Sequence, residues 1–220
     1  RLAVTASVDN TARIWVVATA ECVHVLSHPC VVETAVFSPC NGFVLTSCSD
    51  GIARSWSVAD GTCMLDFKHG GSMHNAMFDN LGELVLTSGR SSVKVWGRSD
   101  GHENVTIYED RLYGATFSPD ARLIAGILCC SKPGHGCYNR CAGHVKIWSG
   151  KDGLSVLDIT TDVLPYRIAF APDGRRLAAV CSNSLRYWDL IGDDATMHVI
   201  GKDNDAYYAW LSCAFSSCGR

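Results

Sequence analysis

The side chains best suited to chemistry are gathered in one segment, where thiols and imidazoles follow one another closely. Zinc binds thiolate sulfur and imidazole nitrogen in a tetrahedral arrangement, and one ion can order a short loop. This single short segment carries Cys129, Cys130, His135, Cys137, Cys141 and His144. Their spacing matches no standard zinc motif. Three interpretations therefore stay open: a zinc site, a local disulfide, and a loop without a ligand.

The rest of the sequence carries no motif of a known catalytic site. It contains no Gly-x-Ser-x-Gly elbow, no Gly-x4-Gly-Lys phosphate loop and no His-Glu-x2-His helix. The paired carboxylates Glu109–Asp110 and Asp193–Asp194 lie in turn-like segments, which indicates solvated side chains. We therefore expect a protein that is not an enzyme and that needs no cofactor, unless the Cys/His-rich segment binds zinc.

Composition narrows the class of protein further. Of the 220 residues, 47% are hydrophobic and 19% are charged, which is typical of a globular chain. The net charge is −3, and Arg175-Arg176 is the longest run of basic residues, so we expect no nucleic-acid partner. The apolar stretches are too short for a membrane-spanning helix, and we expect no membrane association.

The cysteines bear on the compartment in which the protein works. There are twelve, and Cys22 and Cys63 stand at equivalent positions of the repeat described below. Cys181 and Cys213 fall inside apolar segments. A disulfide framework is not expected from such positions, because the same geometry would have to recur in each repeat. We interpret these cysteines as small buried or turn residues of a reduced intracellular protein, cytoplasmic or nuclear.

An internal repeat organises the whole chain. Five tryptophans end a basic-x-Trp segment, at Trp15, Trp56, Trp96, Trp148 and Trp188. Their intervals are nearly equal, except for a longer one between Trp96 and Trp148. Between them recur Phe-centred turns at Phe37, Phe78, Phe117, Phe170 and Phe215. The separation of each Phe from the next Trp is also nearly constant, except after Phe117, so this unit carries an insertion at residues 129–143.

Each unit reads as short strands joined by tight turns. Asp-Gly pairs recur at turn positions, where glycine tolerates a positive φ, and no window shows a sustained helical period. Four short antiparallel strands in about 40 residues predict a blade of a β-propeller.

On these features the chain resembles the WD40-repeat β-propellers. The resemblance depends on the Phe-Ser-Pro turns, the basic-x-Trp endings, His28 and His69 at the Gly-His position, and Trp188-Asp189. It implies an all-β fold of four-stranded antiparallel blades, in an incomplete piece of a seven-bladed ring. The expected repeat units are residues 2–28, 29–69, 70–109, 110–161 and 162–203, with a lone strand at 207–215.

The resemblance also implies a buried hydrogen-bond network in each blade, linking a His, a Ser or Thr, an Asp and the Trp. By repeat, the expected members are Ser7, Asp9 and Trp15; His28, Asp50 and Trp56; and His69, Ser88 and Trp96. Cys48 stands in the hydroxyl position of the second network. Arg90 replaces the Asp of the third, which we expect to be broken. We interpret these residues as structural and not catalytic.

Partner binding is expected where the repeat is least regular. The position four residues before each Phe changes from Glu33 to His74, Tyr113, Tyr166 and Leu211, so no packing rule fixes it. Tyrosine and arginine dominate interface energies. The candidate contact residues are Arg111, Tyr113, Tyr166, Arg167, Tyr207 and Tyr208.

The sequence thus predicts a non-catalytic scaffold that presents a rigid propeller face to a peptide or protein partner in a multi-protein complex. Two alternatives remain. One is a metal- or redox-responsive regulatory module built on the Cys/His-rich insertion. The other is the propeller segment of a larger regulatory enzyme complex.

Overall fold

The computed structural model describes residues 1–129, 143–181, 184–190 and 196–200, which form strands and no helix. The predicted all-β fold of antiparallel propeller blades is confirmed. The chain divides into two compact units, Arg1–Tyr108 and Glu109–Arg220, and each is described by itself. The second unit contains His144 and Cys129 of the Cys/His-rich segment; Cys130, His135, Cys137 and Cys141 lie outside the described residues, as do Tyr207, Tyr208 and the strand predicted at 207–215.

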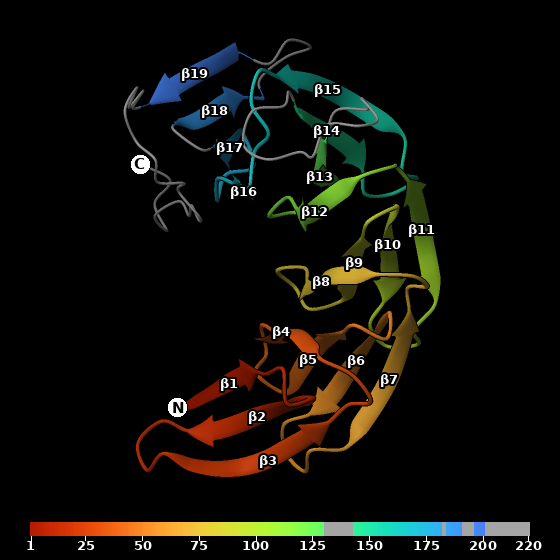
Figure 1. The fold of residues 1–220 in the computed structure, drawn as a ribbon, viewed down its shortest axis with the longest axis vertical. Helices are drawn as coiled ribbons and strands as arrows, with labels where there is room; N and C mark the ends of the chain where they lie inside the picture. The colour runs from red at the N-terminus through yellow and green to blue at the C-terminus, as the bar shows by residue number, and fades with distance from the viewer. Residues whose placement is uncertain (130–142, 182–183, 191–195, 201–220) are drawn as a thin grey trace. The chain divides into compact units, whose positions relative to one another are not determined.

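The first unit contains three antiparallel sheets in which strands that follow one another in sequence pair side by side (Figure 1). The first sheet has three strands and the next two have four. In order, the strands are β1 (Leu2–Ala6), β2 (Thr11–Val16) and β3 (Glu21–Ser27); β4 (Val32–Phe37), β5 (Phe43–Cys48), β6 (Ile52–Ser57) and β7 (Cys63–Lys68); β8 (Met73–Phe78), β9 (Leu84–Gly89), β10 (Ser92–Gly97) and β11 (Glu103–Tyr108).

The second unit contains two sheets of four strands built in the same way. Their strands are β12 (Leu112–Phe117), β13 (Leu123–Cys129), β14 (Gly143–Ser149) and β15 (Ser155–Thr161); β16 (Arg167–Phe170), β17 (Arg176–Val180), β18 (Leu185–Asp189) and β19 (Thr196–Ile200).

Tight turns join the strands at positions that require a left-handed backbone. After the Phe anchors, Asn41, Gly82, Ala121 and Gly174 have positive φ angles of 57°, 71°, 57° and 69°. In the turn after each Trp strand, Ala20, Gly61, Gly101 and Gly153 have φ angles of 57° to 72°. Only glycine adopts this region without a steric cost from Cβ, which explains the recurring Asp-Gly pairs.

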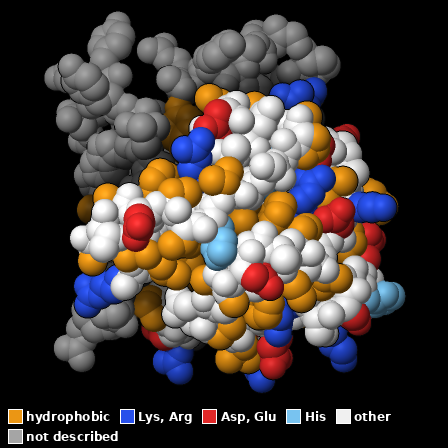
Figure 2. Space-filling view, turned by 90° about the horizontal axis from the view of Figure 1, so that it is seen from below, with side chains coloured by type: hydrophobic (Ala, Val, Ile, Leu, Met, Phe, Trp, Pro, Cys, Tyr) orange, Lys and Arg blue, Asp and Glu red, His pale blue; other side chains and the backbone are white. Residues whose placement is uncertain are grey.

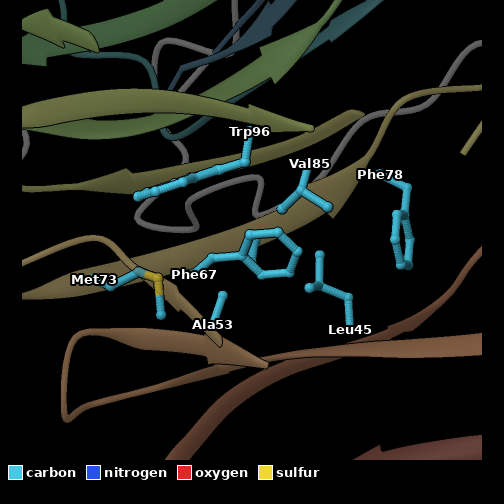
Figure 3. Packing of buried hydrophobic residues seen from close by; sticks show 8 residues of the cluster. Leu45, Ala53, Phe67, Met73, Phe78, Val85 and Trp96 are labelled. Carbon is cyan, nitrogen blue, oxygen red and sulfur yellow. The ribbon is translucent and has the colours of Figure 1, made fainter. Parts of the chain in front are cut away.

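Within each unit the core lies between neighbouring sheets. Trp96 of β10 packs against Phe67 of β7, with ring centroids 6.0 Å apart, and Leu45 of β5 lies in the same cluster (Figure 3). Trp56 packs in the same way on Ile14 of the preceding sheet. Trp56, Trp96 and Trp188 therefore each pack against the sheet before their own.

The first and last strands of the sheets have different surroundings. First strands of neighbouring sheets contact each other, β1 with β4, β4 with β8, and β12 with β16. Last strands lie at the other edge, and four of them carry a β-bulge opposite the tryptophan. The extra residues in these bulges are exposed, and they are Val23, Met64, Asn104 and Val156.

The surface mixes side chains of every kind. On the face seen in Figure 2, acidic and basic side chains alternate with apolar ones. Among the described residues no helix has the length and apolar character needed to span a bilayer.

Candidate functional site

A chain of hydrogen bonds fixes the tryptophan in each of the first three sheets. The indole N–H groups of Trp15, Trp56 and Trp96 donate to the Oγ1 atoms of Thr5, Thr46 and Thr87, at 3.0, 2.9 and 2.9 Å respectively. Each threonine lies opposite the basic residue of the basic-x-Trp segment, so its side chain shares the face of the sheet with the indole.

The predicted hydroxyl positions of these networks were wrong. The sequence pointed to Ser7, Cys48 and Ser88, but the hydroxyl that reaches the indole stands one or two positions earlier in the strand. The Ser7 hydroxyl accepts the Asp9 N–H, and the Cys48 thiol points at the Cys30 carbonyl. Ser88 follows Thr87 and faces away from Trp96, since neighbouring strand residues alternate. A threonine nine or ten residues before Trp15, Trp56 and Trp96 was the signal available in the sequence.

Two of the networks include a buried imidazole. His28 Nδ1 lies 3.0 Å from the Leu26 carbonyl, an acceptor, so Nδ1 carries the proton. His28 Nε2 then accepts from the Thr46 hydroxyl at 2.8 Å. Burial lowers the pKa of His28, since the charged form would lose its solvation. The imidazole is thus held neutral as one member of a structural chain.

The third network is intact, contrary to the prediction made from Arg90. His69 Nδ1 lies 2.8 Å from the Thr87 hydroxyl, and its Nε2 lies 3.1 Å from the Ser92 hydroxyl. The Ser92 hydroxyl is the hydrogen-bond partner of the imidazole in place of an aspartate. Burial, followed by the charge of Lys94, lowers the pKa of His69 to about 4.

The aspartates of the first two networks bind the basic residue before the tryptophan. Asp50 accepts from the Ile52 N–H at 3.0 Å and from Arg54 Nη2 at 2.7 Å. Burial alone would raise the pKa of Asp50, but these hydrogen bonds outweigh it and lower the pKa. Asp9 holds Thr11 and Arg13 in the same way. These carboxylates fix hairpins, which is a structural role.

The basic residues of the other sheets find their carboxylates elsewhere. Lys94 pairs with Glu103 of β11 at 2.8 Å, and Lys146 pairs with Glu109 at 2.5 Å. Arg186, which is 4% exposed, pairs with Asp162. Every basic-x-Trp segment thus has an ion pair: Lys94 takes its acid from the next strand, and Lys146 and Arg186 take theirs from the segment before the first strand of their own sheet.

The fourth and fifth sheets lack the threonine altogether. Gly126 stands in its place opposite Lys146, and Ala179 stands opposite Arg186. The indole Nε1 of Trp188 is buried without a hydrogen-bond partner among the described residues. The networks of the first unit therefore have no counterpart at these two tryptophans.

The variable position before Phe37, Phe78 and Phe117 coincides with a β-bulge. In the first strands of three sheets the extra, unpaired residue is Glu33, His74 or Tyr113. All three are exposed, whereas the preceding residues Val32, Met73 and Leu112 are 4%, 2% and 2% exposed. A bulge re-aims one side chain of a strand. We call Glu33, His74 and Tyr113 the first-strand bulge residues.

The predicted contact residues of the second unit lie at the starts of neighbouring strands. Tyr113 is 49% exposed, and the exposed Arg111 just before β12 has a φ of 61°. Tyr166 precedes β16 and donates its N–H to the Val180 carbonyl at 2.7 Å, and Arg167 is exposed in β16. Because β12 and β16 contact each other, both pairs belong to one edge of the unit.

The two described members of the Cys/His-rich group do not come together. Cys129 pairs with Gly143 and His144 with Leu128, so their side chains lie on opposite faces of the sheet. Cys129 is buried with Ile127 and Leu164, while His144 Nδ1 lies 3.0 Å from Asp158. Among the described residues no cluster of potential metal ligands occurs.

Comparison with known proteins supports the repeat. The family model described as WD domain, G-beta repeat, matches residues 20–57 and 158–189. No curated protein matches the chain. The first match runs from β3 through the end of β6 and the second from β15 to the end of β18, so each ends on a tryptophan strand. Residues 20–57 and 158–189, one segment in each unit, are therefore similar to the WD40 repeat.

Proposed function

We propose that the chain is a non-catalytic scaffold that binds a protein partner through the first-strand edge of its second unit. WD40 repeats generally mediate protein–protein interaction. The finer assignment, to Arg111, Tyr113, Tyr166 and Arg167, has its support in one observation. Tyr113 is a half-exposed aromatic residue on a bulge, and Leu112 just before it and Ala115 two residues after it are buried.

Rigid presentation is what makes this position suitable for binding. A side chain anchored on a buried strand loses little conformational freedom when a partner covers it, so less binding free energy is spent on ordering. Tyrosine offers a large contact area with only two rotatable bonds, and arginine adds charge-assisted hydrogen bonds. The role needs no cofactor, because binding here is noncovalent.

We place this role inside the cell, in the cytoplasm or nucleus. The support comes from cysteines that serve as small apolar residues. Cys48 and Cys181 are fully buried, and burial raises the pKa of the Cys181 thiol to about 11. Cys22, Cys30, Cys40 and Cys63 are exposed free thiols, which would be open to oxidation or pairing in an oxidising compartment and persist in a reducing one.

Site-specific photo-crosslinking tests the proposal. The full chain, carrying a photo-reactive phenylalanine analogue at Tyr113, is irradiated in lysate of its source cells beside a chain labelled at exposed Val156 of β15. We expect a discrete protein adduct from position 113 that is absent from position 156. Equal adducts at both positions would refute the assignment.

A variant carrying Arg111→Ala, Tyr113→Ala and Tyr166→Ala is the matched affinity test. We expect its affinity for the crosslinked partner to fall at least 100-fold, since each hot-spot truncation removes about 1–4 kcal/mol. Thermal unfolding of the variant must match that of the parent chain. Undiminished affinity in a folded variant would move the contact away from this edge.

A further inference from the structure

The last strands of the five sheets differ in how their open edges are protected. An edge strand exposes unpaired N–H and C=O groups, and proteins blunt such edges with bulges and charged side chains. Four last strands have both devices: each carries a bulge and at least one acidic residue, namely Glu21 in β3, Asp66 in β7, Glu103 in β11 and Asp158 in β15.

The fifth last strand, β19, has neither device. Its sequence, Thr-Met-His-Val-Ile, contains no Lys, Arg, Asp or Glu, and its register with β18 runs without a shift from Asp189↔Thr196 to Leu185↔Ile200. Within the described residues β19 pairs only with β18. Met197, Val199 and Ile200 are 49%, 41% and 51% exposed. A regular, uncharged and apolar edge of this kind is a template for another strand.

We infer that β19 binds an extended segment of a partner protein, which adds to the sheet as a further strand. The open main-chain groups of β19 would supply the hydrogen bonds, and alternate side chains would supply the preference for sequence. This surface is separate from the first-strand edge proposed above, because β16 and β19 are the opposite edges of one sheet.

The side chains of β19 define the chemistry of that segment. Met197 lies opposite Trp188 and Val199 opposite Arg186, so these two apolar side chains share one face. On the other face, His198 stacks on Tyr187 at 4.6 Å and its Nε2 lies 3.1 Å from Asp189. The segment therefore has β-branched or aromatic residues at alternate positions and no charge at its centre.

A second copy of the chain fits this edge less well. Five residues make a strand of about 17 Å, and with a width of about 10 Å the contact is only a few hundred Å². A stable dimer needs about 1,200 Å² or more. A short peptide segment tolerates a small contact because main-chain hydrogen bonds supply its affinity.

The test uses the full chain and an acetylated seven-residue peptide of alternating threonine and valine. A copy of that peptide methylated at every amide nitrogen is the control for main-chain pairing. We expect the plain peptide to bind and the methylated peptide to bind at least tenfold more weakly. Val199→Lys and, independently, Met197→Lys should each weaken binding at least tenfold, and Val156→Lys on the bulged β15 less than twofold.

Sedimentation of the chain alone distinguishes the occupants. A monomer that binds the plain peptide supports a partner strand. A dimer that Val199→Lys converts to monomer makes the occupant a second copy and overturns the inference. Equal binding of both peptides, or no binding to a folded chain, overturns it as well. None of these outcomes depends on Tyr113, so the proposed function is judged separately.

Discussion

Gly126 lies directly beneath the indole of Trp148: a Cβ at position 126 would come within 2.6 Å of the ring atom Cζ3. In the first three sheets this position holds the threonine that accepts the indole N–H. In the fourth sheet the ring itself occupies the space, so van der Waals packing replaces a hydrogen bond.

Placing a threonine at the equivalent position should have opposite effects on the free energy of unfolding in the two sheets of the second unit. Gly126→Thr should lower the free energy of unfolding by at least about 2 kcal/mol, because the ring must move. Ala179→Thr should stabilise relative to Ala179→Val by about 1 kcal/mol, because only the hydroxyl can accept the buried Trp188 N–H. Urea unfolding of the variants measures both differences. A valine variant as stable as the threonine variant would show that Trp188 gains no hydrogen bond.

Thr87→Val should be more damaging than Thr5→Val. Thr87 serves both the buried Trp96 indole and the buried His69 imidazole, and two buried polar groups lose a partner together. We expect a loss of about 2–4 kcal/mol. Thr5 serves only the half-buried Trp15, and its loss should be below about 1 kcal/mol. Urea unfolding of the full chain compares the two variants, and equal losses would contradict the shared role of Thr87.

Stability should fall as the pH is lowered from 6.5 towards 4. In this range an unfolded His69 binds a proton while the folded one, with a pKa of about 4, does not, so acid favours unfolding. The whole drop is roughly 3 kcal/mol for His69, at about 1.4 kcal/mol per pKa unit. The lowered pKa of His28 acts in the same direction.

Two substitutions check the origin of this pH dependence. His69→Gln should flatten the profile between pH 6.5 and 4, measured by urea unfolding at each pH. His102→Gln, at an exposed position that is not among the charges acting on His69, should leave the slope unchanged. A slope that His69→Gln does not alter would assign the effect to other groups.

Ala20→Gly and Ala121→Gly should each stabilise the protein by up to about 1 kcal/mol. Both alanines have a φ of 57°, in turns where the other repeats place glycine or asparagine. The left-handed region costs a residue with Cβ about 1–2 kcal/mol, which exceeds the entropic cost of glycine. Differential scanning calorimetry measures the gain. Ala12→Gly in the buried part of β2 is the control and should destabilise.

The repeat could be predicted from sequence because its markers are spaced by whole blades. Trp15, Trp56 and Trp96 recur at nearly equal intervals. Trp56 and Trp96 lie in the third strand of their sheets, and Trp15 lies in β2, the equivalent strand of the three-stranded sheet. The hydroxyl partners could not be placed as surely, because they depend on strand register. A shift of two residues keeps a side chain on the same face but moves it out of reach, as for Cys48 and Thr46.

The consequence of Arg90 was misjudged for a related reason. Sequence comparison between repeats showed a missing aspartate, but it could not show that Ser92 replaces it at the imidazole. The bulges could not be predicted from the sequence, although the variable position before each Phe could be identified. A position whose residue type changes from repeat to repeat thus indicated an exposed side chain, as at Glu33 and His74.

The basic residues of the basic-x-Trp segments pair with carboxylates from different elements, and this difference opposes strand mispairing between repeats during folding. Arg54 finds its acid in the hairpin before its own strand, Lys94 in the strand after it, and Lys146 in the segment before β12. If a nascent sheet recruited the strand of a different repeat, a partly buried cation would lose its match. The ion pairs therefore distinguish the third sheet from its neighbours, and the first two sheets from the last two.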